Sequence, residues 1–124
     1  MLILIIMDDA SARSLKQILL TMGADQVVEA DSVENALMIM NFCVPDIVIG
    51  DWQISGMSSL SIVKDLRSRP EFKNTPIVMC TTESGKKRSS ALLVGVSNWL
   101  IKPIQRPQLE EKIRPLIKAA ASKD

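Results

Sequence analysis

Side chains that could do chemistry stand where the apolar runs of this sequence end. The first run, LILIIM at residues 2–7, stops on two adjacent aspartates, Asp8 and Asp9. Successive side chains of a strand point to opposite faces, so neighbouring carboxylates cannot both be ordinary solvent-facing residues of one strand. Three later runs also end on polar residues, which are Asp51, Thr81 and Lys102.

This set of groups suits a metal-assisted reaction at phosphorus. Three carboxylates in one cleft repel one another unless a cation lies between them, and hard oxygen ligands favour Mg²⁺. With the metal held by Asp8 and Asp9, Asp51 becomes a candidate nucleophile, since aspartyl phosphate is an established kind of covalent intermediate. The Lys102 ammonium would offset charge on the phosphoryl oxygens, and the Thr81 hydroxyl would donate a hydrogen bond to one of them.

Each of these residues also has an ordinary structural interpretation. The Asp8-Asp9 pair could cap a helix, because side-chain oxygens and negative charge stabilise helix N-termini. Thr81 could be a β-branched strand residue, and Lys102 a surface lysine before a proline. The functional hypothesis depends on their combination at four matching strand ends in one chain.

The elements that must position these residues follow from the hydrophobic pattern. Apolar runs typical of strands lie at residues 2–7, 26–30, 46–50, 76–81 and 98–101. Helical spacing occupies about 15–22, 33–40, 58–70, 85–94 and 109–117, and Pro115 predicts a kink or an early end in the last helix. The alternation predicts an α/β fold, a doubly wound five-stranded parallel sheet with five helices, and the polar run 26–30 belongs at an edge.

In such a sheet, ligands bind at the carboxyl ends of the strands, where the strand order reverses. The five candidate residues all follow or end strands, so they are expected to converge there. The sequence thus predicts one site built from residues that are distant along the chain.

Composition narrows the possible functions. The 124 residues carry a net charge of +1, without the basic excess typical of nucleic-acid binding, and contain no histidine. That absence excludes Ser-His and Cys-His nucleophile pairs. No apolar run is long enough to span a bilayer, and the first lacks the features of a signal peptide. We therefore expect one cytoplasmic domain over residues 1–124, with Cys43 and Cys80 reduced in the core rather than joined.

The motifs IIMDD, PDIVIGDWQISGM, TPIVMCTTES and NWLIKPI resemble the receiver domain of bacterial two-component response regulators, the CheY-like family. The resemblance covers nearly the whole chain and implies the strand order 2-1-3-4-5. It implies that Asp51 accepts a phosphoryl group from a sensor histidine kinase or a histidine phosphotransfer protein. It also implies that Mg²⁺ is bound by Asp8, Asp9, Asp51 and the backbone carbonyl of Gln53.

The resemblance further implies how the phosphorylated state is used. Thr81 and Lys102 would contact the phosphoryl group, and Trp99 stands where the family usually has a tyrosine or phenylalanine that moves on activation. We expect the signal to leave through the fourth helix, fifth strand and fifth helix to a downstream protein target. Such a protein catalyses only its own phosphoryl transfer and dephosphorylation.

Three departures from the family pattern concern this output. After Asp51, the frequent M-P-x-M-D-G stretch is replaced by residues 54–59, ISGMSS, in which Ser58 is a good candidate N-cap. Thr82 replaces a frequent alanine, and Trp99 is bulkier than the usual residue. A buried Trp99 would need a partner for its indole N–H.

Three other functions remain open. A degenerate receiver could act as a phosphorylation-independent interaction module. An Asp-nucleophile phosphohydrolase would need a second aspartate as general acid, where this chain has Gln53. A flavodoxin-like cofactor binder would need a phosphate-cradling first loop, and Asp8 and Asp9 would repel that phosphate.

Overall fold

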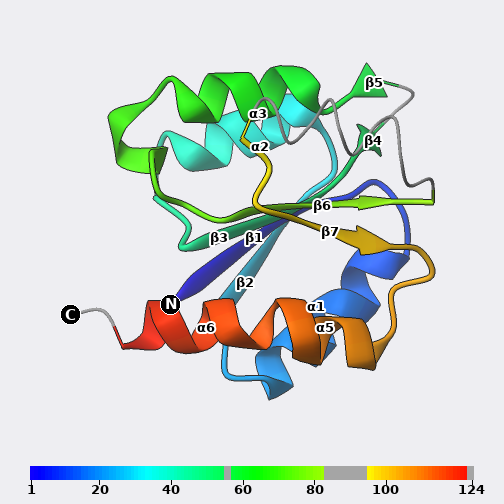
Figure 1. The fold of residues 1–124 in the computed structure, drawn as a ribbon. Helices are drawn as coiled ribbons and strands as arrows, with labels where there is room; N and C mark the ends of the chain where they lie inside the picture. Colours follow the sequence, from blue (N-terminus) through cyan, green and yellow to red (C-terminus); the bar gives the residue numbers. More distant parts are fainter. Residues whose placement is uncertain (55–56, 83–94, 123–124) are drawn as a thin grey trace.

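The computed structural model describes residues 1–54, 57–82 and 95–122, and it contains a five-stranded parallel sheet (Figure 1). The strand order β2-β1-β3-β6-β7 is the predicted order 2-1-3-4-5. The strands are β1 (Leu2–Ile6), β2 (Gln26–Ala30), β3 (Ile47–Asp51), β6 (Ile77–Thr81) and β7 (Asn98–Ile101). The predicted fold class is confirmed.

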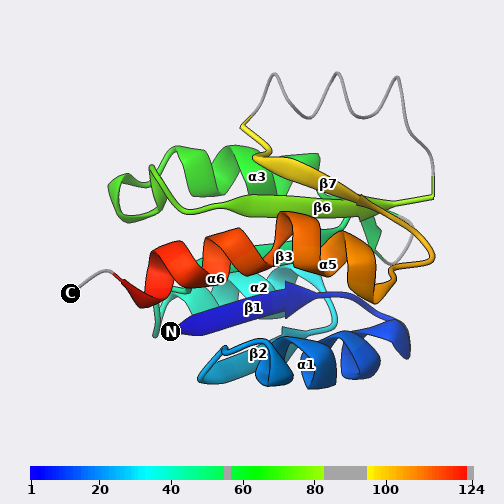
Figure 2. The ribbon, with the colours of Figure 1, turned by 60° about the horizontal axis from the view of Figure 1, so that its bottom comes forward.

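Helices cover both faces of the sheet (Figure 2). One face carries α1 (Ser11–Thr21), α5 (Arg106–Lys112) and α6 (Arg114–Ala121), and the other carries α2 (Val33–Met40), α3 (Leu60–Arg67) and the short 3₁₀ helix η1 (Pro70–Phe72). The fourth predicted helix, 85–94, lies outside the described residues. No helix in the described part of the chain is long and apolar enough to cross a membrane.

The apolar runs are continuous because the central strands are buried on both faces. In β3, Ile47 and Ile49 pack in the core under α1, α5 and α6, whereas Val48 packs in the core under α2 and α3. At the edge, Gln26 and Glu29 of β2 are exposed, as expected for the more polar strand.

The last helical stretch is broken, as predicted, next to Pro115. Helix α5 ends at Lys112, α6 begins at Arg114, and the proline stands in the first turn of α6. Proline has no N–H to continue the helical hydrogen bonds, so the first turn of a new helix accommodates it.

The stretch after Asp51 was not predicted correctly. Residues Gln53–Ile54 (β4) and Met57–Ser58 (β5) pair as a short antiparallel ribbon, and residues 55–56 lie outside the described part. The N-cap of α3 is Ser59 rather than Ser58, and its hydroxyl makes no capping bond. The predicted start of the third helix, near residue 58, is close to the observed start at Leu60. Nothing in the sequence pattern predicts the ribbon with two residues in each strand.

Candidate functional site

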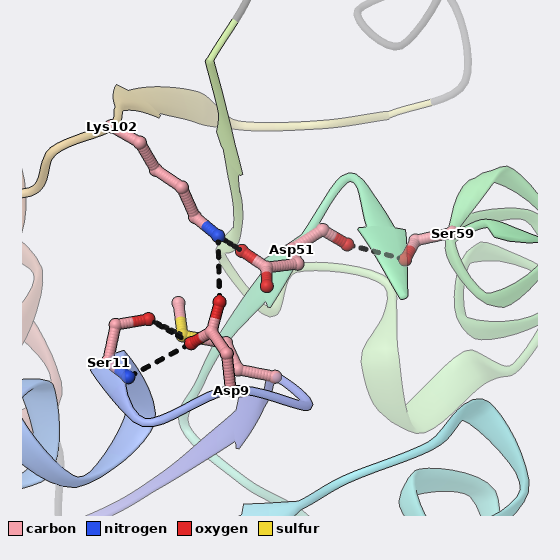
Figure 3. Close-up of polar contacts among 6 residues, drawn as sticks. Asp9, Ser11, Asp51, Ser59 and Lys102 are labelled. Carbon is pink, nitrogen blue, oxygen red and sulfur yellow. Dashed lines mark hydrogen bonds and ion pairs between the residues drawn. The ribbon is translucent and has the colours of Figure 1, made fainter. Parts of the chain in front are cut away.

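The carboxyl ends of four strands meet at one edge of the sheet, where Asp9, Asp51 and Lys102 point toward one another (Figure 3). Asp51 is the last residue of β3, and Thr81 is the last residue of β6. Lys102 directly follows β7, and its backbone N–H donates to the Thr81 carbonyl oxygen at 2.9 Å. Because parallel strands end on the same side, residues as far apart in sequence as Asp9 and Lys102 become neighbours.

Three carboxylates form the acidic part of this site. Each of Asp8, Asp9 and Asp51 offers an oxygen, and these oxygens all lie within 4.8 Å of one another. Asp8 and Asp9 are exposed, whereas Asp51 is 3% exposed. The donor set fits Mg²⁺, which binds hard oxygen ligands and keeps part of its water shell.

Lys102 is the cationic partner of this cluster. Its Nζ lies 2.7 Å from Asp51 Oδ1 and 3.5 Å from Asp9 Oδ2. Burial lowers the pKa of Lys102, but the hydrogen bond to Asp51 and the charges of Asp51 and Asp9 outweigh it, so the pKa is raised. The ammonium therefore keeps its charge throughout the physiological pH range.

Asp9 is also held from its own loop, by a residue that the sequence analysis missed. The backbone N–H of Ser11 donates to Asp9 Oδ1 at 2.9 Å, and the Ser11 hydroxyl donates to the same oxygen. These bonds lower the pKa of Asp9, the hydroxyl being the largest cause. The Asp-x-Ser spacing at a helix start is typical of this turn and could have revealed it.

Asp51 has the opposite electrostatic environment. Burial raises the pKa of its carboxyl, and the charges of Asp9 and Asp8 add to that effect, so that the bond to Lys102 only partly opposes it. The carboxylate is therefore held in a position where its negative charge is unfavourable without a further cation.

The backbone around Asp51 is fixed by a second residue that the sequence analysis missed. The Ser59 hydroxyl donates to the Asp51 carbonyl oxygen at 2.6 Å, and the Ser59 N–H donates to the Trp52 carbonyl oxygen at 2.7 Å. On the other side, the Trp52 N–H donates to the Cys80 carbonyl oxygen at 2.8 Å. The strand end that carries Asp51 is thus held from both sides.

A cavity of about 200 Å³ opens beside Asp51. It offers room for a group the size of phosphate, with carboxylate, hydroxyl and ammonium groups on its wall. Gln53 is exposed and borders the same space. The lining residues are Asp51, Trp52, Gln53, Cys80, Thr81, Thr82 and Lys102.

Trp99 is buried rather than at the surface, with 3% of its area exposed. Its ring packs against Trp52, with centroids 5.5 Å apart and planes inclined by 56°. The indole N–H of Trp99 is buried and finds no acceptor among the described residues. The residue next to Asp51 and the expected switch residue are therefore in direct contact.

Comparison with known proteins agrees with this geometry. The model of the response regulator receiver domain family matches residues 3–114 of the chain. The chain belongs to this family. It is a phosphoacceptor receiver of two-component signalling, and a signalling protein rather than an enzyme, so a histidine kinase is implied as a partner.

Individual receivers resemble the chain over most of its length. A chemotaxis protein CheY homolog of Campylobacter jejuni is 35% identical over 119 residues, which cover 92% of this chain and 91% of the relative. The chemotaxis response regulator CheY4 of Vibrio cholerae is 27% identical, with a TM-score of 0.81 over 93% of this chain and 97% of that structure. The receiver domain of a Pseudomonas aeruginosa sensor histidine kinase, solved with magnesium in its active-site cleft, shares the fold at 18% identity, with a TM-score of 0.80 over 94% and 97% of the two chains.

The environment of Asp51 in this receiver predicts a pH-dependent stability. Because the pKa of Asp51 is raised on folding, this group favours the folded state below its unfolded pKa, and that contribution is lost as pH rises through the folded pKa. In metal-free buffer at pH 7, Asp51→Asn should therefore raise the melting temperature by about 4 °C. In a domain of this size, that shift corresponds to an increase of about 1 kcal/mol in the free energy of unfolding.

The same melting experiment at pH 3 should bring Asp51→Asn and the wild type together, since both side chains are then neutral. Asp9→Asn is the matched control. Because folding lowers the pKa of Asp9, loss of its negative charge should decrease the stability of the folded state at pH 7. An Asp51→Asn protein that melts at or below the wild-type temperature at pH 7 would contradict this electrostatic account.

Proposed function

We propose that Asp51 accepts the phosphoryl group of a phosphohistidine on a sensor histidine kinase or a histidine phosphotransfer protein. The observation that carries this assignment is the position of its carboxylate. Of the three clustered carboxylates, that of Asp51 is the buried one, ends a central strand, contacts the Lys102 ammonium and borders the cavity. A carboxylate whose charge is unfavourable in this setting becomes a reactive nucleophile when a phosphoryl group is brought to it.

In the transfer, a carboxylate oxygen of Asp51 forms a bond to phosphorus as the phosphorus–nitrogen bond to the donor histidine breaks. The electron pair of that bond returns to the imidazole, which leaves. Lys102 Nζ, already 2.7 Å from the Asp51 carboxylate, offsets charge on the phosphoryl oxygens. The Thr81 hydroxyl, on the wall of the cavity, donates a hydrogen bond to one of them.

We propose that Asp8, Asp9, Asp51 and the backbone carbonyl of Gln53 hold Mg²⁺. The clustered carboxylate oxygens support this assignment, and so does the magnesium ion in the cleft of the Pseudomonas receiver domain. When bound, Mg²⁺ supplies positive charge that offsets the phosphoryl oxygens during transfer.

We propose that residues 1–124 act as a single receiver domain in the cytoplasm and signal to a downstream protein target, with no direct contact to nucleic acid or membrane. Gln53 carries no ionisable group, which argues against use of the same aspartate in a phosphohydrolase with a general acid at this position. The complete set of Asp8, Asp9, Asp51, Thr81 and Lys102 at one edge argues against a degenerate receiver.

The assignment of Asp51 predicts the outcome of labelling with a small phosphodonor. Acetyl phosphate with Mg²⁺ should give the wild type an acid-stable, base-labile acyl phosphate, and Asp51→Asn should abolish it. Removal of the metal with EDTA should suppress labelling. Asp46→Asn is the control, because this aspartate precedes β3 at its opposite end. If Asp51→Asn labels as strongly as the wild type, the acceptor lies elsewhere.

The metal assignment predicts weaker binding when either exposed carboxylate is neutralised. Titration with Mg²⁺ should change the fluorescence of Trp52, which adjoins Asp51. Asp8→Asn and Asp9→Asn should each weaken binding by roughly 1 kcal/mol, a factor of about five. Glu71→Gln, on η1 at the other end of the sheet, should leave the titration unchanged. Identical curves for wild type and both aspartate variants would refute the metal site.

We propose that Trp99 changes its environment when Asp51 is phosphorylated, because Trp52, the residue after the acceptor, packs against it and Thr81 ends the neighbouring strand. The change is followed by acrylamide quenching in Trp52→Phe, where Trp99 is the sole tryptophan. Quenching should differ between the phosphorylated and unphosphorylated states, and Thr81→Ala should remove the difference while Asp51 still labels. Equal quenching in both states would make Trp99 a fixed core residue.

A further inference from the structure

Lys102 directly follows strand β7, which lies at the edge of the described sheet, beside β6. An edge strand has backbone groups that no neighbouring strand satisfies. In β7, side chains bond the outward-facing backbone groups of Trp99 and Ile101. The Trp99 N–H donates to Asn98 Oδ1 at 2.8 Å, and the Trp99 carbonyl accepts from Lys112 Nζ at 2.7 Å. The groups of Ile101 are bonded by Gln108.

The Gln108 amide binds Ile101 as a neighbouring strand would. The Ile101 N–H donates to Gln108 Oε1 at 2.9 Å, and Gln108 Nε2 donates to the Ile101 carbonyl at 2.8 Å. The same Nε2 lies 3.4 Å from the Pro103 carbonyl oxygen. One amide group therefore bonds to the residues on both sides of Lys102.

We propose that Gln108 is a positioning residue for Lys102, holding the backbone from which its ammonium reaches Asp51. This inference rests on the proposed phosphoryl transfer to Asp51. On the side of β6, the Lys102 N–H is fixed by the Thr81 carbonyl; on the side of α5, its two neighbours are fixed by Gln108. The backbone at Lys102 is thus held between β6 and α5.

The chemistry of Gln108 separates this role from an electrostatic one. The side chain is half-buried and uncharged, and its hydrogen bonds go to backbone groups. Its removal adds or removes no charge at the acidic cluster. Any effect on the reaction must therefore reach Asp51 through the placement of Lys102, whose Nζ has to lie within about 3 Å of its partner to act.

The test compares phosphorylation rates with phosphoramidate as the donor. Gln108→Met keeps the length and the helix propensity of the side chain but removes all three hydrogen bonds. It should slow labelling of Asp51 about tenfold, since a displacement of about 1 Å can reduce a rate by up to about a hundredfold. The Mg²⁺ titration should stay unchanged, because Lys102 does not hold the metal. Gln105→Met is the matched control, since that side chain is exposed and makes no capping bond.

A double-mutant cycle decides whether Gln108 acts through Lys102. In a Lys102→Ala background, Gln108→Met should cause no further loss of rate. Gln108→Asn, which keeps a neutral amide but shortens the side chain by one methylene, should be intermediate, and it replaces Gln108→Met where that variant fails to fold. A wild-type rate in Gln108→Met, an equal loss in the Lys102→Ala background, or a parallel loss of Mg²⁺ affinity would each overturn the proposal.

A second measurement needs no phosphoryl transfer. The Lys102 amine, shielded by its contact with Asp51, should be acetylated by acetic anhydride several-fold faster in Gln108→Met than in the wild type, as mapped by mass spectrometry. Equal acetylation would overturn the positioning role even if the wild type proves not to label. A wild type that fails to label on Asp51 but shows faster Lys102 acetylation in Gln108→Met would instead refute the proposed acceptor and leave the positioning role supported.

Discussion

Burial of the Asp51 carboxylate among two other carboxylates is the constraint on which the rest of the site depends. A buried charge is strongly unfavourable unless it is paired and hydrogen-bonded. Lys102 supplies the pairing in this structure, 2.7 Å away, yet the pKa of Asp51 stays raised because burial and the charges of Asp9 and Asp8 outweigh it. The negative charge that Lys102 leaves uncompensated favours binding of a divalent cation. The cation and Lys102 can then both contact a phosphoryl group.

The fold meets this constraint through parallel strands. All strand ends of a parallel sheet face one edge, so β1, β3, β6 and β7 each deliver a side chain to the same place without a long loop. Each end is then fixed locally: Ser11 holds Asp9, Ser59 holds the backbone of Asp51, and the Thr81 carbonyl holds Lys102. Lys102 follows the edge strand, where only one neighbouring strand supplies backbone hydrogen bonds. Side chains of α5 therefore bond the outer backbone groups of this strand.

The sequence predicts the strands and brings forward the five candidate site residues because each of these leaves a strong local signal, whereas the strand order followed only from the resemblance to the receiver family. An apolar run ends on a polar residue, and the periodicity changes from strand to helix. Ser59 and Gln108 leave no such signal, since a serine near a helix start or a glutamine within a helix is ordinary, and their importance comes from which backbone groups they face. Ser11 leaves only the weaker signal of the Asp-x-Ser spacing. The β4–β5 ribbon is two residues per strand, too short for any periodicity. The burial of Trp99 against Trp52 depends on sheet register, which pairs Trp99 with Met79.

The most direct test of the central claim is the titration of the Asp51 carboxyl carbon by ¹³C NMR in metal-free buffer. The account predicts a pKa above the ordinary aspartate value of 3.8, because burial and two neighbouring negative charges disfavour ionisation. Lys102→Ala should raise this pKa further, and Mg²⁺ should lower it. A carboxyl that titrates at or below 3.8 without metal would contradict the account, because Asp51 would then be an already satisfied carboxylate with no need for a further cation.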